Sequence, residues 1–282
     1  MAVRIVTDSI ADLPSRVVQE LGITVVPLII HFGSKAYRDG VDMSADQFYV
    51  QLQESEVFPT TSTPPPQAFA DAYDSLAANA QEIVVITLSA RLSGTYEAAL
   101  QGRTLKSKNC RVEVIDSQAA AMAQGLIVMK AAQAALAGAT VNEIREIVEH
   151  HKPRAELLAA FDTLEYLRRG GRIGAAKAYL GSMLNVNPLI TLKGGVVKPA
   201  GRTRSRAKAI DQLYEFAAGY SSIDEMVVEN TACPEEAEDL IERLAAVFPN
   251  ERIYRSKMTP VIGAHTGPGL LVVVVLGDRP RP

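Results

Sequence analysis

The stretch EIVVITLSARLSGTYEAAL, residues 82 to 100, joins an apolar run, a short polar turn and an alanine-rich pattern. A β-branched run followed by Ser93, Gly94 and a helical pattern indicates a strand, a loop and a helix. The turn has four candidate roles: a nucleophile, a phosphate-binding loop, a carboxylate-binding site or a helix cap. The rest of the chain has to decide between them.

The first half of the chain repeats this alternation. The predicted strands are RIVTD (4 to 8), ITVVPLII (23 to 30), EIVVITL (82 to 88) and VEVID (112 to 116). Helical patterns separate them, which indicates βαβ units and a mostly parallel sheet. Predicted helix starts are the capping boxes Ser44 to Gln47 and Thr140 to Glu143, and an N-cap at Ser117.

The pattern changes after about residue 153. LITLKGGVVKPAG predicts a β-hairpin around Lys193 to Gly195, and a helix capped by Thr203 follows it. A strand at MVVE, a helix at PEEAEDLIERLAAVF and a strand at GLLVVVVLG complete this part. We therefore predict an α/β protein with two domains, residues 1–153 and 154–282, the second with a mixed sheet.

Composition limits the possible functions. The net charge of −3 gives no general reason to bind nucleic acid, and LLVVVVL (270 to 276) is too short to span a bilayer. Cys110 and Cys233 lie far apart without further cysteines, which favours reduced thiols in the cytoplasm, and no cluster of metal ligands accompanies His265. The start MAVRIVTDS lacks the pattern of an export signal. We expect no metal, no cofactor, no nucleic-acid partner and no integral membrane contact.

Two roles of the Ser93 turn lose support from the sequence. Arg91 and Leu92 precede Ser93 where a hydrolase would have GxSxG, and no GxxxxGK[ST] pattern occurs in the chain. A serine-dependent hydrolase or acyltransferase using Ser93 and His265 remains the alternative function. A helix cap remains compatible with anion binding, because a helix N-terminus offers free N–H groups and a partial positive charge.

Other candidate residues also have two interpretations. Thr61 and Ser62 are either an N-cap before prolines or ligand-binding groups that converge with Ser93 at the edge of the sheet. His265, in a glycine-rich loop, is either structural or a donor to an anion. The segment RRGGR (168 to 172) is a helix C-terminus, and the arginine-rich face that it forms with GRTRSRAK (201 to 208) leaves a nucleic-acid-binding module as a third hypothesis.

Together these segments resemble the DegV family of fatty-acid-binding proteins. The stretches that carry the resemblance are VTDSIADLP (6 to 14), TTSTP (60 to 64), LSARLSGTYEAA (88 to 99), VIDSQAAAMAQGLIV (114 to 128), DTLEYLRRGGRIG (162 to 174), NPLITLKGGVVKPAGRTRS (187 to 205) and GAHTGPG (263 to 269). Their order and spacing cover nearly the whole chain. Two positions depart from the family pattern: Ile10 stands in place of a threonine, and the segment 63–66 reads TPPP.

The resemblance implies the family's two-domain (EDD-type) fold: a three-layer α/β/α domain, then a two-layer α/β domain with a mixed sheet. It implies a non-enzymatic carrier that buries a long-chain acyl group such as palmitate between the domains. The ligand carboxylate would be held by Thr61, Ser62, Ser93, Gly94, Thr95 and His265, with Arg169 nearby. The implied partner is a fatty acid kinase related to dihydroxyacetone kinases, which would dock at Arg202 and form the acyl phosphate.

Overall fold

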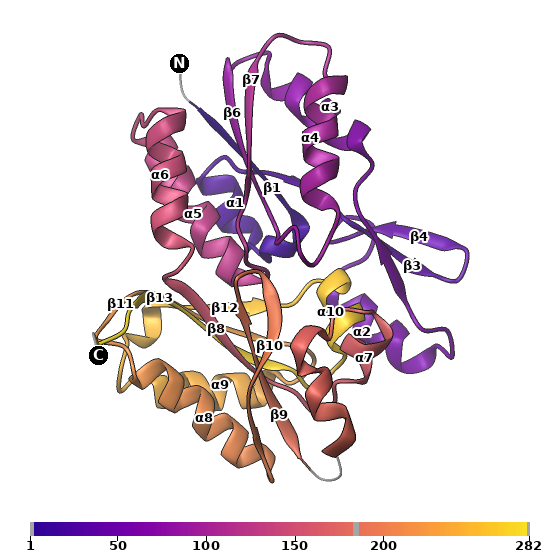
Figure 1. The fold of residues 1–282 in the computed structure, drawn as a ribbon, viewed down its shortest axis with the longest axis vertical. Helices are drawn as coiled ribbons and strands as arrows, with labels where there is room; N and C mark the ends of the chain where they lie inside the picture. The colour runs from indigo at the N-terminus through magenta and orange to yellow at the C-terminus, as the bar shows by residue number, and fades with distance from the viewer. Residues whose placement is uncertain (1–2, 183–185, 281–282) are drawn as a thin grey trace.

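The structure is a computed structural model that describes residues 3–182 and 186–280. Two large β-sheets lie one above the other in Figure 1, and a small sheet projects beside them. The strands of one large sheet all precede residue 117, and those of the other all follow residue 154. The α/β class is confirmed, with a parallel sheet first and a mixed sheet second. The domain division at residue 153 stays a prediction.

The first large sheet is parallel, in the order β2-β1-β6-β7. Its strands are β1 (Arg4–Asp8), β2 (Thr24–Val26), β6 (Glu82–Thr87) and β7 (Arg111–Asp116). Helices α3 (Pro66–Leu76) and α4 (Thr95–Leu105) cover one face, while α1 (Ser15–Glu20), α5 (Met122–Leu136) and α6 (Val141–His151) belong to the other. Strand side chains alternate between faces, so β6 packs Ile83 and Val85 on α3 and α4 and buries Val84 and Ile86 opposite. These are the three predicted layers.

The second large sheet is mixed, in the order β10-β9-β8-β13-β11-β12, and only β11 and β12 run parallel. Its strands are β8 (Ala155–Ala160), β9 (Asn187–Lys193), β10 (Val196–Thr203), β11 (Ser222–Asn230), β12 (Ile253–Lys257) and β13 (Leu271–Asp278). Helices α8 (Arg206–Ala218) and α9 (Pro234–Leu244) cover one face. The other face belongs to the core shared with the first half, which explains why β13 is apolar from Leu271 to Leu276: Val273 points to the helices, and Val272 and Val274 point away from them.

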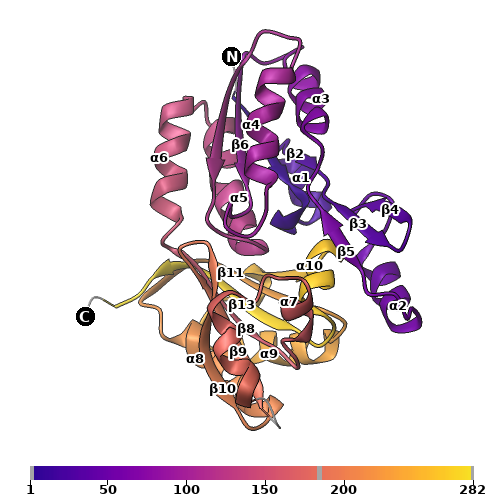
Figure 2. The same ribbon diagram turned by 45° about the vertical axis from the view of Figure 1, so that its right-hand side comes forward.

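The small antiparallel sheet has the order β4-β3-β5, formed by β3 (Ile29–Phe32), β4 (Lys35–Arg38) and β5 (Thr60–Ser62). The prediction of one strand over 23 to 30 is therefore wrong. Pro27 has no N–H for a sheet ladder, and the chain leaves the parallel sheet there. Figure 2 shows this sheet and α2 (Ala45–Glu54) reaching past the first sheet to α10 (Pro260–Thr266).

The structure confirms some predicted helix starts and corrects others. Both capping boxes are present, at Ser44 for α2 and at Thr140 for α6. Helix α5 begins at Met122 rather than after Ser117, and α8 is capped by Ser205 rather than Thr203. Thr61 and Ser62 lie in the strand β5 and do not cap a helix. Helix α3 begins later, at Pro66. The predicted hairpin is confirmed as β9 and β10.

Candidate functional site

A cavity of about 320 Å³ lies between the two large sheets. It falls within the usual size range of small-molecule sites, about 300–1,000 Å³. Most of the lining is apolar: Ile10, Leu28, Leu88, Leu92, Ala120, Ala121, Leu157, Ala159, Phe161, Leu167, Ile190, Leu192, Val197, Met258, Val261, Ile262, Leu270 and Val272. The polar lining residues are Thr61, Ser62, Thr63, Ser93, Arg172, His265 and Thr266. Such a cavity suits a mainly apolar ligand.

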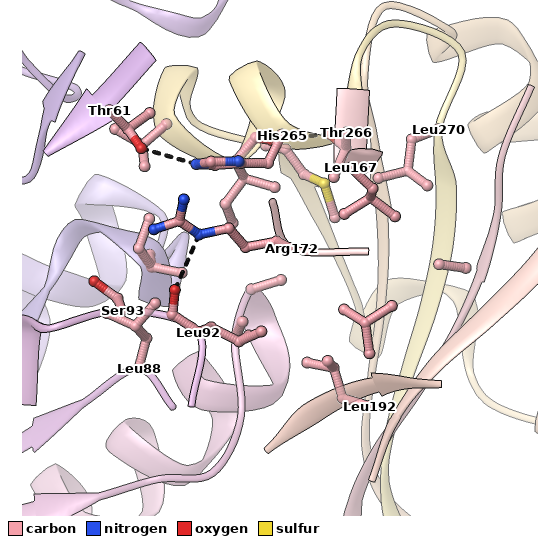
Figure 3. Close-up of a pocket in the computed structure, with 18 of the residues that line it drawn as sticks. Thr61, Leu88, Leu92, Ser93, Leu167, Arg172, Leu192, His265, Thr266 and Leu270 are labelled. Carbon is pink, nitrogen blue, oxygen red and sulfur yellow. Dashed lines mark hydrogen bonds between the residues drawn. The ribbon is translucent and has the colours of Figure 1, made fainter. Parts of the chain in front are cut away.

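Four of the polar side chains gather at one side of the cavity. Figure 3 shows Thr61, His265, Arg172 and Ser93 together, with Leu192 across the cavity from them. Thr61 comes from β5, His265 from α10, Ser93 from the turn after β6, and Arg172 from the segment after α7 (Glu165–Arg169). The cavity is thus polar at one end and apolar at the other.

His265 is neutral and has one free ring nitrogen. Burial, together with the nearby Arg172, lowers its pKa from 6.5 to about 4. Nε2 and Thr61 Oγ1 share a hydrogen bond of 2.8 Å, and the buried Nδ1 has no partner in the described part of the chain. Because a buried N–H tolerates the loss of a partner less well than a lone pair does, we assign the proton to Nε2. His265 then donates to Thr61, whose own hydroxyl proton is left to donate into the cavity.

Arg172 brings a positive charge to the same end. Its Nε donates to the carbonyl of Leu92 (3.1 Å) and its Nη1 to the carbonyl of Gly170 (2.7 Å). Within residues 3–182 and 186–280, these carbonyls are the only hydrogen-bond partners of the guanidinium, and no carboxylate pairs with it. A guanidinium has five N–H donors, so several remain for an anion.

Ser93 is held by Thr95, two residues further along the chain. Its Oγ lies 2.9 Å from Thr95 Oγ1 and accepts the Thr95 N–H at 3.3 Å. The N-cap of α4 is Gly94, one residue after the predicted cap Ser93. Gly94 is exposed and Thr95 is fully buried, and neither lines the cavity. Thr95 therefore positions Ser93 rather than facing a ligand.

The arrangement differs from the one that a hydrolase needs. A serine nucleophile is activated by a base within hydrogen-bond reach, about 2.6–3.2 Å away. Here His265 bonds Thr61, and Ser93 bonds Thr95. His265 also lies on α10 and not in the predicted glycine-rich loop, since that loop begins only at Gly267.

The strand β5 separates Thr61 from Ser62. Successive side chains in a strand point to opposite faces. Thr61 bonds His265 at the cavity. Ser62 also belongs to the lining, but it is exposed and its hydroxyl bonds Nε2 of His31 on β3 at 2.9 Å. Both positions at which the sequence departs from the family pattern lie at this cavity. Ile10 and Thr63 belong to its lining, and Ile10 adds apolar surface.

The arginines of RRGGR have different environments. Arg168 and Arg169 both pair with Glu165 in α7, and Arg169 also stacks on Phe58 at 5.1 Å from the ring centre. Arg169, expected near the carboxylate, is exposed and does not line the cavity; Arg172 does. The sequence contains one signal that separates these arginines. Glu165 stands three residues before Arg168 and four before Arg169, the spacing of helical ion pairs, so Arg172 is the arginine of this segment without such a partner. Arg202 is exposed on β10.

The described residues contain neither a cluster of metal ligands nor a membrane-spanning helix. No group of three or more His, Cys, Asp or Glu side chains in this part of the chain is placed to hold a metal ion. No helix in this part is long and apolar enough to cross a membrane.

Known proteins resemble the chain along nearly its whole length. The sequence profile of an "uncharacterised protein, DegV family" matches residues 2–278. A DegV domain-containing protein of Streptomyces coelicolor is 42% identical over 278 residues, which are 97% of this chain and 98% of that protein. The structure of a fatty-acid-binding DegV family protein from Thermus thermophilus has a TM-score of 0.90 and 32% identity, and covers 98% of this chain and 100% of its own. DegV of Bacillus subtilis, a fatty acid binding protein, gives 0.89 and 31%, with 99% and 100% coverage.

Proposed function

Because the chain belongs to the DegV family, we propose that it binds one long-chain fatty acid in the cavity between its two large sheets. The observation that carries this proposal is Arg172, whose guanidinium faces a mostly aliphatic cavity without a carboxylate partner in the described chain. A fatty acid has the complementary chemistry, a single carboxylate on an apolar chain. Arg172, Thr61 and Ser93 would hold that carboxylate, and His265 would orient the Thr61 hydroxyl toward it.

The energetics agree with this assignment. Burying an unpaired carboxylate is costly, and charge-assisted hydrogen bonds offset that cost. The Thr61 hydroxyl, the Ser93 hydroxyl and the guanidinium supply donors without a metal ion. Each CH₂ of the acyl chain that leaves water contributes about 0.8 kcal/mol, so a long chain supplies most of the affinity.

The first experiment is extraction and native mass spectrometry of the purified protein. We expect one long-chain fatty acid per chain. In delipidated protein, Arg172→Gln should weaken fatty-acid affinity at least about tenfold, because a hydrogen bond to a charged group is worth about 1.5–3 kcal/mol. Arg169→Gln is the matched control and should change affinity little, since that side chain pairs with Glu165 on the surface. Absence of any bound or bindable fatty acid would refute the proposal.

We further propose that the protein is a cytoplasmic, non-catalytic carrier that presents the fatty acid to a kinase related to dihydroxyacetone kinases, which forms the acyl phosphate. Two features support this: both cysteines are free thiols, and Ser93 and His265 bond to threonines rather than to each other. Arg202, exposed on β10, is the proposed docking residue.

The docking proposal predicts that Arg202→Ala lowers acyl-phosphate formation by such a kinase with ATP while fatty-acid affinity stays unchanged. Arg103→Ala on the exposed side of α4 serves as the control and should leave both quantities unchanged. Equal kinase rates for the wild type and Arg202→Ala would contradict a docking role.

A further inference from the structure

A second cavity, of about 220 Å³, lies behind the apolar end of the first. Leu157 and Leu192 line both cavities, so their side chains separate one from the other. Figure 3 shows Leu192 on the far side of the first cavity from Thr61 and His265. The acyl chain of a ligand whose carboxylate lies at Thr61 would therefore run toward this pair.

The two leucines are side by side for a reason of register. Strands β8 and β9 are antiparallel, and Ala159 pairs with Ile190. Moving two residues along each strand in opposite directions brings Leu157 opposite Leu192 on the same face of the sheet. Thr191 Oγ1 donates to the carbonyl of Leu157 at 2.8 Å and fixes the strands at this position.

The hairpin that follows Leu192 is also fixed. Ser89 Oγ, in the turn after β6, donates to the carbonyl of Gly195 at 2.8 Å across the two halves of the molecule. A β-carbon at Gly195 would collide with that same hydroxyl, and the glycine has a φ of +78°. The backbone around the leucines is thus held on both sides, and these two leucines are the residues that the linings of the two cavities share.

The second cavity has a different character from the first. Its lining includes Gln118, Lys152, Glu156 and Lys193, and Glu156 pairs with Arg279. The remaining lining residues are apolar, so an acyl chain that entered it would still gain from burial, but less for each CH₂ than in the first cavity. The methyl end of a ligand is best accommodated on the near side of Leu157 and Leu192.

We propose that Leu157 and Leu192 form the end wall of the acyl-binding cavity and set the longest fatty acid that the protein accepts. This inference rests on the proposed function, because it assumes that an acyl chain occupies the first cavity. Up to the wall, each further buried CH₂ should raise affinity about fourfold. Beyond the wall, affinity should stop rising.

The test measures affinity for saturated fatty acids from dodecanoate to tetracosanoate. The variant with both Leu157→Ala and Leu192→Ala joins the two cavities, and its longest tightly bound chain should exceed that of the wild type. Leu270→Ala makes the same kind of truncation at one leucine that lines only the first cavity. It should weaken binding of all chains without raising the limit.

Leu192→Phe enlarges the side chain at the end wall instead of truncating it. The position is half-buried, and this variant avoids the loss of two core side chains. It should shorten the limit relative to the wild type. If the wild type binds fatty acids and the double alanine and phenylalanine variants both keep its chain-length limit, the end-wall inference is wrong and the proposed function stands. If the wild type binds no fatty acid of any length, both are wrong.

Discussion

Gly170 determines where the imidazole of His265 can lie. The glycine ends α7 with φ −72° and ψ −7°, a conformation open to any residue, so its backbone angles do not require glycine. A β-carbon there would collide with Nδ1 of His265 and lie within 3.1 Å of the Tyr166 carbonyl. The absent side chain therefore makes room for the ring that bonds Thr61.

We predict that Gly170→Ala displaces His265 and weakens fatty-acid affinity by about tenfold, because Thr61 loses its partner and the carboxylate loses a positioned donor. Calorimetric titration of the delipidated protein measures the change. Gly219→Ala is the matched control: Gly219 ends α8 with φ −80° and ψ 4°, and a β-carbon there meets only ordinary contacts of 3.4 Å or more. Equal affinities for the two variants would show that the Gly170 contact does not position the imidazole.

At the scale of elements, the sequence predicts long segments better than short ones. The strand at 82 to 88 and the helix after it are confirmed as β6 and α4, because a buried apolar run and a helical pattern both extend over several residues. Strand β5 has three residues, TTS, and its ladder partner β3 lies 31 residues earlier. Serine and threonine before prolines match a helix cap equally well, so only the distant partner settles the assignment.

The start of α5 shows a second limit. Ser117 has the chemistry of an N-cap, yet its Oγ accepts the N–H of Ala119, and the chain then passes through Ala121 at φ +56° before the helix begins. The N–H of Met122 at that start is bound by the Glu229 carboxylate, 107 residues away. A helix capped from another sheet has no local signature.

Some residues of the candidate site could be predicted from local motifs, whereas Arg172 could not. Thr61, Ser93 and His265 stand in motifs that the resemblance covers, and the structure brings all three to the cavity. Arg172 follows Gly171 at φ +71°, where the chain turns after α7, and the direction of its side chain depends on the carbonyl of Leu92 in the other half. The helix C-terminus interpretation of RRGGR describes Arg168 and Arg169 and cannot reveal this contact.

At the scale of the whole molecule, four carboxyl groups are buried in the core, and three of them, Asp12, Asp39 and Glu229, join the two halves. Asp12 accepts from the backbone of Thr259, Glu229 from that of Met122, Asp39 from that of Val261, and Asp8 from that of Leu88. Burial raises the pKa of Asp8 and of Glu229 to about 7 and that of Asp39 to about 6. Burial and the facing Glu229 also raise the pKa of Asp12.

These shifts make stability depend on pH. An unfolded carboxyl loses its proton near pH 4, whereas these groups in the folded state keep theirs up to about pH 6–7. Between those values the folded state binds more protons, so its stability is greatest below pH 4 for these groups and is lost as the pH rises. His265 opposes this trend below pH 6.5, because its folded pKa of about 4 makes the folded state bind fewer protons. The carboxyl groups are more numerous than His265, so they decide the sign of the change in stability with pH.

We therefore predict that the free energy of unfolding decreases by about 2 kcal/mol or more between about pH 5 and about pH 8, measured by urea titration of delipidated protein. Glu229→Gln removes one of the titrating groups and should flatten this dependence. The variant should gain stability relative to the wild type only at the alkaline end of the range. Asp42→Asn is the control: Arg38 holds the pKa of the exposed Asp42 at about 2, so the group stays ionised across the range and the variant should keep the wild-type slope. A stability that rises with pH in the wild type, or an unchanged slope in Glu229→Gln, would contradict the assignment of these carboxyls as protonated groups of the folded core.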